Sequence, residues 1–208
     1  MADNRAKYGF RFYRARTGGG YPLPEERWLA SGYSGTPGSA NCDVQVGDPM
    51  QLVNDGSLAF ATAGSAGGIS HIVVGIKQYW DGTRLRSGDR VPYASGVYGS
   101  NVERRTLILA VRAEEAIWEV DCNAASTYAT LLAAVNANAD LVYTAVAPNA
   151  TPQLAVSSIN TTAALQLRIQ GLSDTMYNND WTGANAKLLV TINKGQAAGW
   201  AATTIGGV

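Results

Sequence analysis

Short runs of apolar residues that alternate with polar ones fill most of the chain, and they are typical of β-strands that bury one face. Turn sequences such as Asn54-Asp55-Gly56 and Asp81-Gly82 separate these runs. Asp-Gly between two apolar runs is a strong signal for a β-hairpin, because glycine accepts the positive φ that the turn requires. The strands predicted in this first part of the chain are 8–13, 42–46, 50–53, 58–61, 69–76, 106–112 and 116–120.

One segment, 126–142, has helical rather than strand periodicity. Leu131 and Val135 lie four residues apart, on one face of the expected helix. The hydroxyl of Ser126 or Thr127 can cap the first turn, because it accepts a hydrogen bond from a free backbone N–H. The strands predicted after the helix are 153–157, 164–171 and 186–193. The expected fold is all-β, a barrel or sandwich of short antiparallel strands with one short α-helix, built as one body or as two lobes.

Charged residues divide the chain unevenly. Residues 1–125 carry 26 charged side chains, 13 of each sign, whereas residues 126–208 carry only six. The expected segments are an N-terminal arm (1–20), a β-barrel or sandwich domain (21–125) and a charge-poor lobe that contains the helix (126–208). Charged residues are depleted in the buried part of protein interfaces, so the charge-poor lobe favours self-association. We expect a closed cyclic homo-oligomer, with a trimer favoured.

The N-terminal arm combines basic and aromatic residues ahead of the glycines at 18–20. Arginine and aromatic side chains are preferred anchors of protein interfaces. The segment is either a terminal strand packed on its own domain or an arm that contacts a neighbouring protein. In the second interpretation the partner surface is acidic. The candidate contact residues are Arg5, Lys7, Tyr8, Phe10, Arg11, Phe12, Tyr13, Arg14 and Arg16.

Residue patterns for catalysis are missing from the sequence. The one histidine, His71, lies within an apolar strand pattern, where a structural role is more common than a catalytic one. No nucleophile elbow, phosphate-binding loop or dinucleotide-binding fingerprint occurs. We therefore expect no enzymatic activity, no catalytic residue and no cofactor.

Metal ligands are also too few for a recognised site. Cys42 and Cys122 are the only cysteines, and with a single histidine they cannot form a zinc cluster. Residues 174–180 offer oxygen ligands for calcium, but a turn whose Asn and Asp side chains cap the backbone is the preferred interpretation. The two cysteines either form a disulfide or remain buried thiols, and folding in a reducing cytoplasm favours thiols.

Net charge and hydropathy narrow the expected partners. The 16 basic and 16 acidic residues give a net charge of zero, whereas nucleic-acid-binding proteins usually carry a basic excess. No run of about 18 apolar residues occurs, so no membrane-spanning helix is expected. Residues 1–7 are not followed by an apolar leader, so we expect synthesis in the host cytoplasm. Neither nucleic acid nor a membrane is an expected partner.

Six stretches within roughly residues 40–195 share short strands and glycine-containing turns, namely 46–52, 68–76, 88–93, 106–121, 164–172 and 185–193. Together they resemble the head decoration (capsid cement) proteins of tailed bacteriophages. This resemblance implies a shell of major capsid protein as the partner, many copies in each virion, a position on the capsid surface and no cofactor. It supplies no individual site residues. The expected function is a structural virion protein that binds and stabilises the outside of an assembled capsid.

Two other functions remain open. The first is a receptor- or glycan-binding virion protein, such as a head fibre or a tail component, in which tryptophans form a carbohydrate platform. The second is a hydrolase that acts on the cell envelope, and it needs a cluster of carboxylates or metal ligands. A glycan array and the position of the protein in the particle test the first of these alternatives.

Overall fold

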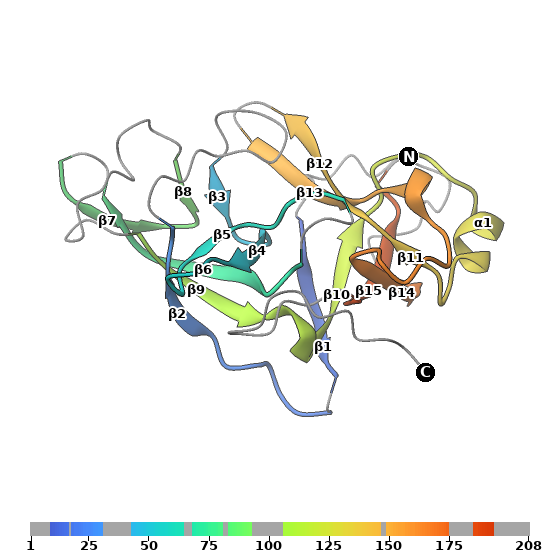
Figure 1. The fold of residues 1–208 in the computed structure, drawn as a ribbon, viewed down its shortest axis with the longest axis horizontal. Coiled ribbons are helices and arrows are strands. Elements are labelled where there is room, and N and C mark those ends of the chain that lie inside the picture. Colours follow the sequence, from blue (N-terminus) through green and yellow to red (C-terminus); the bar gives the residue numbers. More distant parts are fainter. Residues whose placement is uncertain are drawn as a thin grey trace.

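The computed structural model of the chain is mostly β-structure, arranged as antiparallel sheets that resemble a sandwich rather than a closed barrel (Figure 1). This arrangement confirms the predicted all-β class. The described residues are 9–16, 18–30, 43–64, 68–80, 83–92, 106–146, 149–174 and 185–193.

The larger sheet has six strands in the order β2-β9-β6-β4-β5, and β7 pairs with the C-terminal part of β6. Antiparallel neighbours and short turns, as between β4 and β5, follow the predicted hairpins. The bounds are β2 (Glu25–Trp28), β4 (Pro49–Leu52), β5 (Leu58–Phe60), β6 (His71–Trp80), β7 (Leu85–Gly88) and β9 (Leu107–Arg112).

The second sheet has five strands in the order β1-β10-β15-β14-β11. Its central pair joins β10 to β15, with Trp118 opposite Val190, so the predicted boundary at 125 separates neighbouring strands of one sheet. The bounds are β1 (Arg11–Ala15), β10 (Ala116–Asp121), β11 (Asn138–Ala139), β14 (Leu167–Leu172) and β15 (Lys187–Ile192). Two further pairs are β3 (Val44–Gln45) with β8 (Arg90–Val91), and β12 (Leu141–Val146) with β13 (Asn149–Leu154).

The helix α1 (Tyr128–Ala133) is shorter than the predicted segment 126–142. Thr127 caps it as expected, since its Oγ1 accepts a hydrogen bond from the backbone N–H of Thr130 at 3.1 Å. The helix ends because Asn136 adopts a left-handed backbone with φ of 73°, and the chain then continues as β11 and β12. In the described part of the chain, no helix is long and apolar enough to cross a bilayer.

Two short 3₁₀ helices complete the described elements. The first, η2 (Ala113–Glu115), joins β9 to β10, and its two glutamates are exposed, as expected for a solvated connection. The second, η3 (Val156–Ser158), follows β13, so the strand predicted at 153–157 ends three residues early.

One hydrophobic core joins the two sheets. It includes Ile108 of the larger sheet and Trp118 and Leu188 of the second, all of them fully or almost fully buried. The indole N–H of Trp118 donates a hydrogen bond to the Ala113 carbonyl at 2.7 Å, so this large ring is held in one orientation. A fixed tryptophan between the sheets provides the floor on which β1 packs.

The chain reaches β1 through a narrow passage at Gly9. The φ of Gly9 is +68°, and a Cβ atom there would lie 2.8 Å from the Gly47 carbonyl oxygen and 2.9 Å from Pro152 Cγ. The next residue, Phe10, is buried, and its N–H donates to the same Gly47 carbonyl at 2.9 Å. These contacts fix the start of β1 against the turn between β3 and β4.

Candidate binding groove at the N-terminal strand

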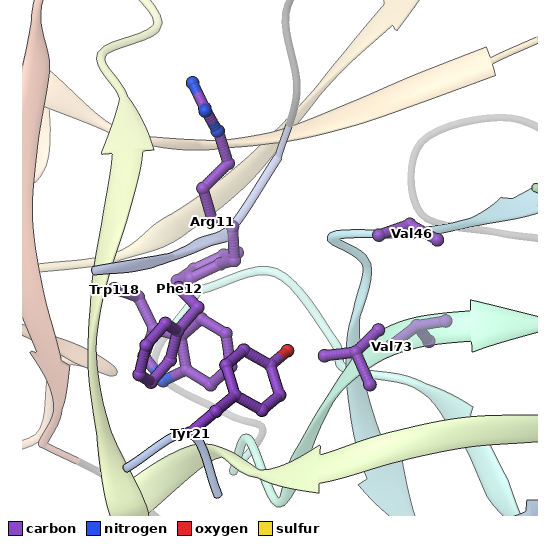
Figure 2. Close-up of a pocket in the computed structure, with 8 residues that line it drawn as sticks. Arg11, Phe12, Tyr21, Val46, Val73 and Trp118 are labelled. Atoms are coloured by element: carbon purple, nitrogen blue, oxygen red, sulfur yellow. The ribbon is translucent and has the colours of Figure 1, made fainter. Parts of the chain in front are cut away.

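A hollow with a volume of about 340 Å³ lies where β1 meets the β3–β4 turn and β6 (Figure 2). We call it the aromatic groove. It is lined by Phe10, Arg11, Phe12, Tyr21, Val46, Val73, Val74 and Trp118. The lining comes from five separated parts of the chain, so the groove forms only when both sheets and β1 are in place.

Three aromatic rings form one wall of the groove. Phe12 lies between the other two, with ring centroids 4.4 Å from Tyr21 and 6.2 Å from Trp118, the latter in an edge-to-face arrangement. Figure 2 shows the three rings grouped on one side. Trp118 is only 1% exposed, whereas Tyr21 is 48% exposed, and partial burial raises the pKa of its phenol above the ordinary value. Tyr21 is thus the ring that a partner can contact directly.

Valine side chains form the opposite wall. Val46 and Val73 face the rings across the groove (Figure 2). Two backbone hydrogen bonds tie the turn to β6, from Gly47 N to the Val73 carbonyl at 2.8 Å and from Val73 N to the Asp48 carbonyl at 2.9 Å. These hydrogen bonds hold the valine wall, and the pairing of β1 with β10 holds Phe12 beside Trp118, so most of the groove is fixed by the fold itself.

Three arginines lie on β1 or directly after it, and one of them, Arg11, lines the groove. The Arg11 side chain points away from the rings (Figure 2), and its Nη1 lies 3.5 Å from Glu119 Oε1. Glu119 is buried and also accepts a hydrogen bond from Ser173 Oγ, so the acidic partner of Arg11 is itself fixed. Arg14 and Arg16 are exposed, and Arg16 donates to the Glu114 carbonyl at 3.2 Å. The groove is therefore apolar except for Arg11, whose charge is paired with Glu119.

The described part of the N-terminal arm is a strand of its own chain, because β1 pairs antiparallel with β10. Phe10 belongs to the core, Arg11 and Phe12 line the groove, and Tyr13, Arg14 and Arg16 are exposed. The remaining candidates, Arg5, Lys7 and Tyr8, lie outside the described residues. A contact between this segment and another protein stays a prediction.

The sequence predicted part of the groove and missed the rest. The sequence gives a weak indication that Tyr21 belongs to a site. It is an aromatic residue in a turn between Gly20 and Pro22, where no strand or helix pattern assigns it to the core. The sequence gives no such indication for Val46, Val73 and Trp118, because their apolar strand patterns indicate only core positions.

His71 lies in the buried interior of the fold. It is 2% exposed, its Nδ1 lies 2.9 Å from Ser70 Oγ, and burial lowers its pKa to about 4. Glu25, the nearby carboxylate, is already bound by Arg27 Nε at 3.0 Å and by Arg112 Nε at 2.8 Å. Neither His71 nor Glu25 lines the groove.

The metal ligands and cysteines considered from the sequence form no site within the described residues. They contain no group of three His, Cys, Asp or Glu residues close enough to hold a metal ion. Cys122 is a buried free thiol, and burial raises its pKa to about 12. Cys42 and residues 175–180 of the candidate calcium loop lie outside the described part of the chain.

Comparisons with known proteins leave the groove as the main functional clue. The scan against protein-family models finds no matching family, and the searches of curated proteins and of solved structures find no match to the chain.

Proposed function

We propose that the chain is a structural virion protein that binds and stabilises the outside of an assembled phage capsid, and that the aromatic groove is its shell contact. The observation that carries this proposal is an aromatic-lined groove bordered by β1, the strand that carries exposed arginines and that the sequence selects as a contact segment. Aromatic and arginine side chains supply most of the anchors in protein interfaces.

The groove defines the chemistry of the partner segment. A volume of about 340 Å³ holds one or two apolar side chains, and Tyr21 and Val46 are open to solvent at its mouth. Arg14 is exposed on the strand that borders the groove, and it is the side chain offered to carboxylates of a partner, since Arg11 already pairs with Glu119. The expected partner is a surface segment of the major capsid protein in which an apolar residue is flanked by carboxylates.

Binding of this kind stabilises a shell without any chemical step. A protein that binds the assembled shell more tightly than its dissociated subunits shifts the equilibrium toward assembly by mass action. Loss of one buried anchor typically costs about 2 kcal/mol, which corresponds to an affinity about 30-fold lower. Many copies on one particle repeat this contribution.

Tyr21→Ser is the variant that tests the groove. Tyr21 is half exposed and lies between the strands, so its replacement leaves the core intact. Leu85→Ser on β7 is the matched control, because Leu85 is an exposed apolar residue that does not line the groove. Empty capsids assembled from the major capsid protein of the same genome serve as the probe in co-sedimentation.

The expected result is that the wild-type protein and Leu85→Ser co-sediment with capsids equally, whereas Tyr21→Ser binds at least about tenfold more weakly. Weaker binding in higher salt is also expected, because exposed arginines are screened by ions. A wild-type protein that stays in the supernatant overturns the capsid proposal. Equal binding by Tyr21→Ser overturns the assignment of the groove.

A receptor- or glycan-binding virion protein is the second candidate. The half-exposed ring of Tyr21 favours it, since sugars stack on aromatic faces. Trp118, the largest ring in the wall, is almost fully covered and offers no free face. A single open ring suits a partner side chain better than a sugar platform. Binding of the purified protein to a glycan array, abolished by Tyr21→Ser, is the result that favours this candidate.

A further inference from the structure

The turn between β3 and β4 buries a carboxyl group. Asp48 lies in this turn and is 1% exposed. Its Oδ2 accepts a hydrogen bond from the Gln45 N–H at 2.7 Å, whereas its Oδ1 is buried without a hydrogen-bond partner among the residues that the structure describes. An ionised carboxylate that loses its hydration needs several donors in compensation. A single donor therefore favours the protonated, neutral carboxyl.

The charges nearest to Asp48 favour the same neutral form. Asp43, just before β3, is also buried, and its negative charge opposes a second one at Asp48. Arg90 on β8 lies 3.4 Å from Asp43 Oδ2, so this cation is paired with Asp43. Burial first, and the charge of Asp43 second, raise the pKa of Asp48 well above its usual value.

The charged residues of the neighbouring strands have other partners. Arg11 on β1 pairs with Glu119. His71, at the start of β6, interacts with charged residues of β2 and β9. The strand that follows the turn, β4, contains no charged residue. Within the described residues, Asp43 is thus the charge that acts on Asp48.

The same turn holds the start of the N-terminal strand. The carbonyl of Gly47, next to Asp48, accepts the Phe10 N–H at 2.9 Å. On its other side the turn is bound to β6, where the Asp48 carbonyl accepts the Val73 N–H at 2.9 Å. Phe10 and β1 contribute one side of the aromatic groove, and Val46 of the turn contributes to the other. A change in the turn therefore reaches both β1 and the groove through backbone hydrogen bonds.

We infer that Asp48 is a proton-dependent switch: its neutral carboxyl keeps the β3–β4 turn closed on β1, and its ionisation opens the turn and releases β1. The closed turn excludes the water that a carboxylate needs, whereas the open turn admits it. Because the closed state has the higher pKa, it is favoured at low pH, and its opening equilibrium rises about tenfold per pH unit between the two pKa values. The switch belongs to the chain itself and holds whether or not the groove binds a capsid.

Hydrogen exchange of the full chain at pH 5 and pH 7 tests the inference. The amides of Phe10 and β1, corrected for the intrinsic effect of pH on exchange, measure the opening, and those of β15 report on the whole core. Asp48→Asn keeps an oxygen that accepts the Gln45 N–H, and it cannot ionise. Asp89→Asn is the matched control, because Asp89 is an exposed aspartate between β7 and β8. Circular dichroism checks that both variants are folded.

In the wild-type protein and in Asp89→Asn, exchange of the β1 amides should be at least about tenfold faster at pH 7 than at pH 5, with a smaller change in β15. In Asp48→Asn the β1 amides should stay protected at both values. The inference is overturned by wild-type β1 exchange that does not change, by an equal rise in β1 and β15, or by a folded Asp48→Asn that behaves like the wild type. If Asp48→Asn does not fold, the wild-type comparison of β1 with β15 decides alone. Capsid binding is tested separately by Tyr21→Ser.

Discussion

His71 connects the stability of the fold to pH in a way that can be worked out in advance. Ser70 Oγ donates its hydrogen to the Met50 carbonyl at 3.1 Å, so it can only accept from His71 Nδ1 at 2.9 Å. The neutral imidazole therefore carries its hydrogen on Nδ1. Its Nε2 is buried and has no hydrogen-bond partner among the residues that the structure describes. Protonation of Nε2 would place a charged N–H where none of these residues accepts it.

The surroundings of His71 also disfavour its protonated form and lower its pKa. Burial is the main cause that lowers its pKa from 6.5 to about 4, and the positive charges of Arg27 and Arg112 lower it further, against the opposing effect of Glu25. Because the folded-state pKa lies below the unfolded one, this stability is complete above pH 6.5 and is lost as the pH falls toward 4. The loss amounts to about 2 kcal/mol at pH 5 and about 3 kcal/mol at pH 4.

Other groups also titrate in this range, so a variant is needed to isolate the histidine. Burial raises the pKa of Asp48 well above its usual value, and its stabilising contribution is present at low pH and lost as the pH rises. Acidification therefore moves Asp48 and His71 in opposite directions. His71→Phe removes only the imidazole titration, and the lost hydrogen bond to Ser70 costs the same at every pH.

The assay is urea unfolding of the wild-type protein and of His71→Phe at pH 7 and pH 5. Between these two values the wild type should lose about 2 kcal/mol more stability than the variant. The chain has one histidine, so its imidazole signal in an NMR titration needs no assignment and should move near pH 4. Equal losses in the two proteins, or a titration near pH 6.5, would refute the argument.

Two further predictions concern Gly9 and Cys122. Gly9→Ala should lower the free energy of unfolding by about 3 kcal/mol, measured with heat or urea, because of the positive φ and the overlap with Gly47. Gly18 also has a positive φ but has open space around it, so Gly18→Ala should lower the free energy of unfolding by about 1 kcal/mol. Equal losses would mean that the passage at Gly9 is not tight. In a Cys42→Ser variant, Cys122 should not react with a thiol reagent at pH 8 until urea is added, because a pKa raised from 9.0 to about 12 makes its thiolate about 1,000-fold scarcer. Rapid reaction of the folded variant would contradict its burial.

Alternation of apolar and polar residues was sufficient to predict β9 and β10, the strands that carry much of the core. β9 and β10 lie where the pattern places them, within one residue at each end. β2 was missed because Glu25, Glu26 and Arg27 give it a polar sequence, and an ion pair between Glu25 and Arg27 is what makes such an edge strand acceptable. β12 was missed because a single left-handed Asn136 ends the helix, and asparagine alone is a weak stop signal.

The groove was predictable only in its N-terminal part. Arg11 and Phe12 stand out because basic and aromatic residues alternate there, and that composition is local. Trp118 lies more than a hundred residues away along the chain, and it reaches Phe12 only through the pairing of β1 with β10. Strand pairing at this separation depends on the whole fold, so local patterns cannot indicate which apolar residues share a groove.

The position of β1 also decides how the proposed contact with a capsid should be tested. Removal of residues 2–16 takes Phe10 out of the core and leaves the β10 edge, with Trp118 beneath it, without its neighbour. A truncated protein that fails to bind would then report a damaged fold as readily as a lost contact. Tyr21→Ser alters the mouth of the groove while Gly9, Phe10 and the β1–β10 pairing stay in place. Because β1 both completes the core and borders the groove, a substitution at an exposed position outside this strand, such as Tyr21, separates binding from folding.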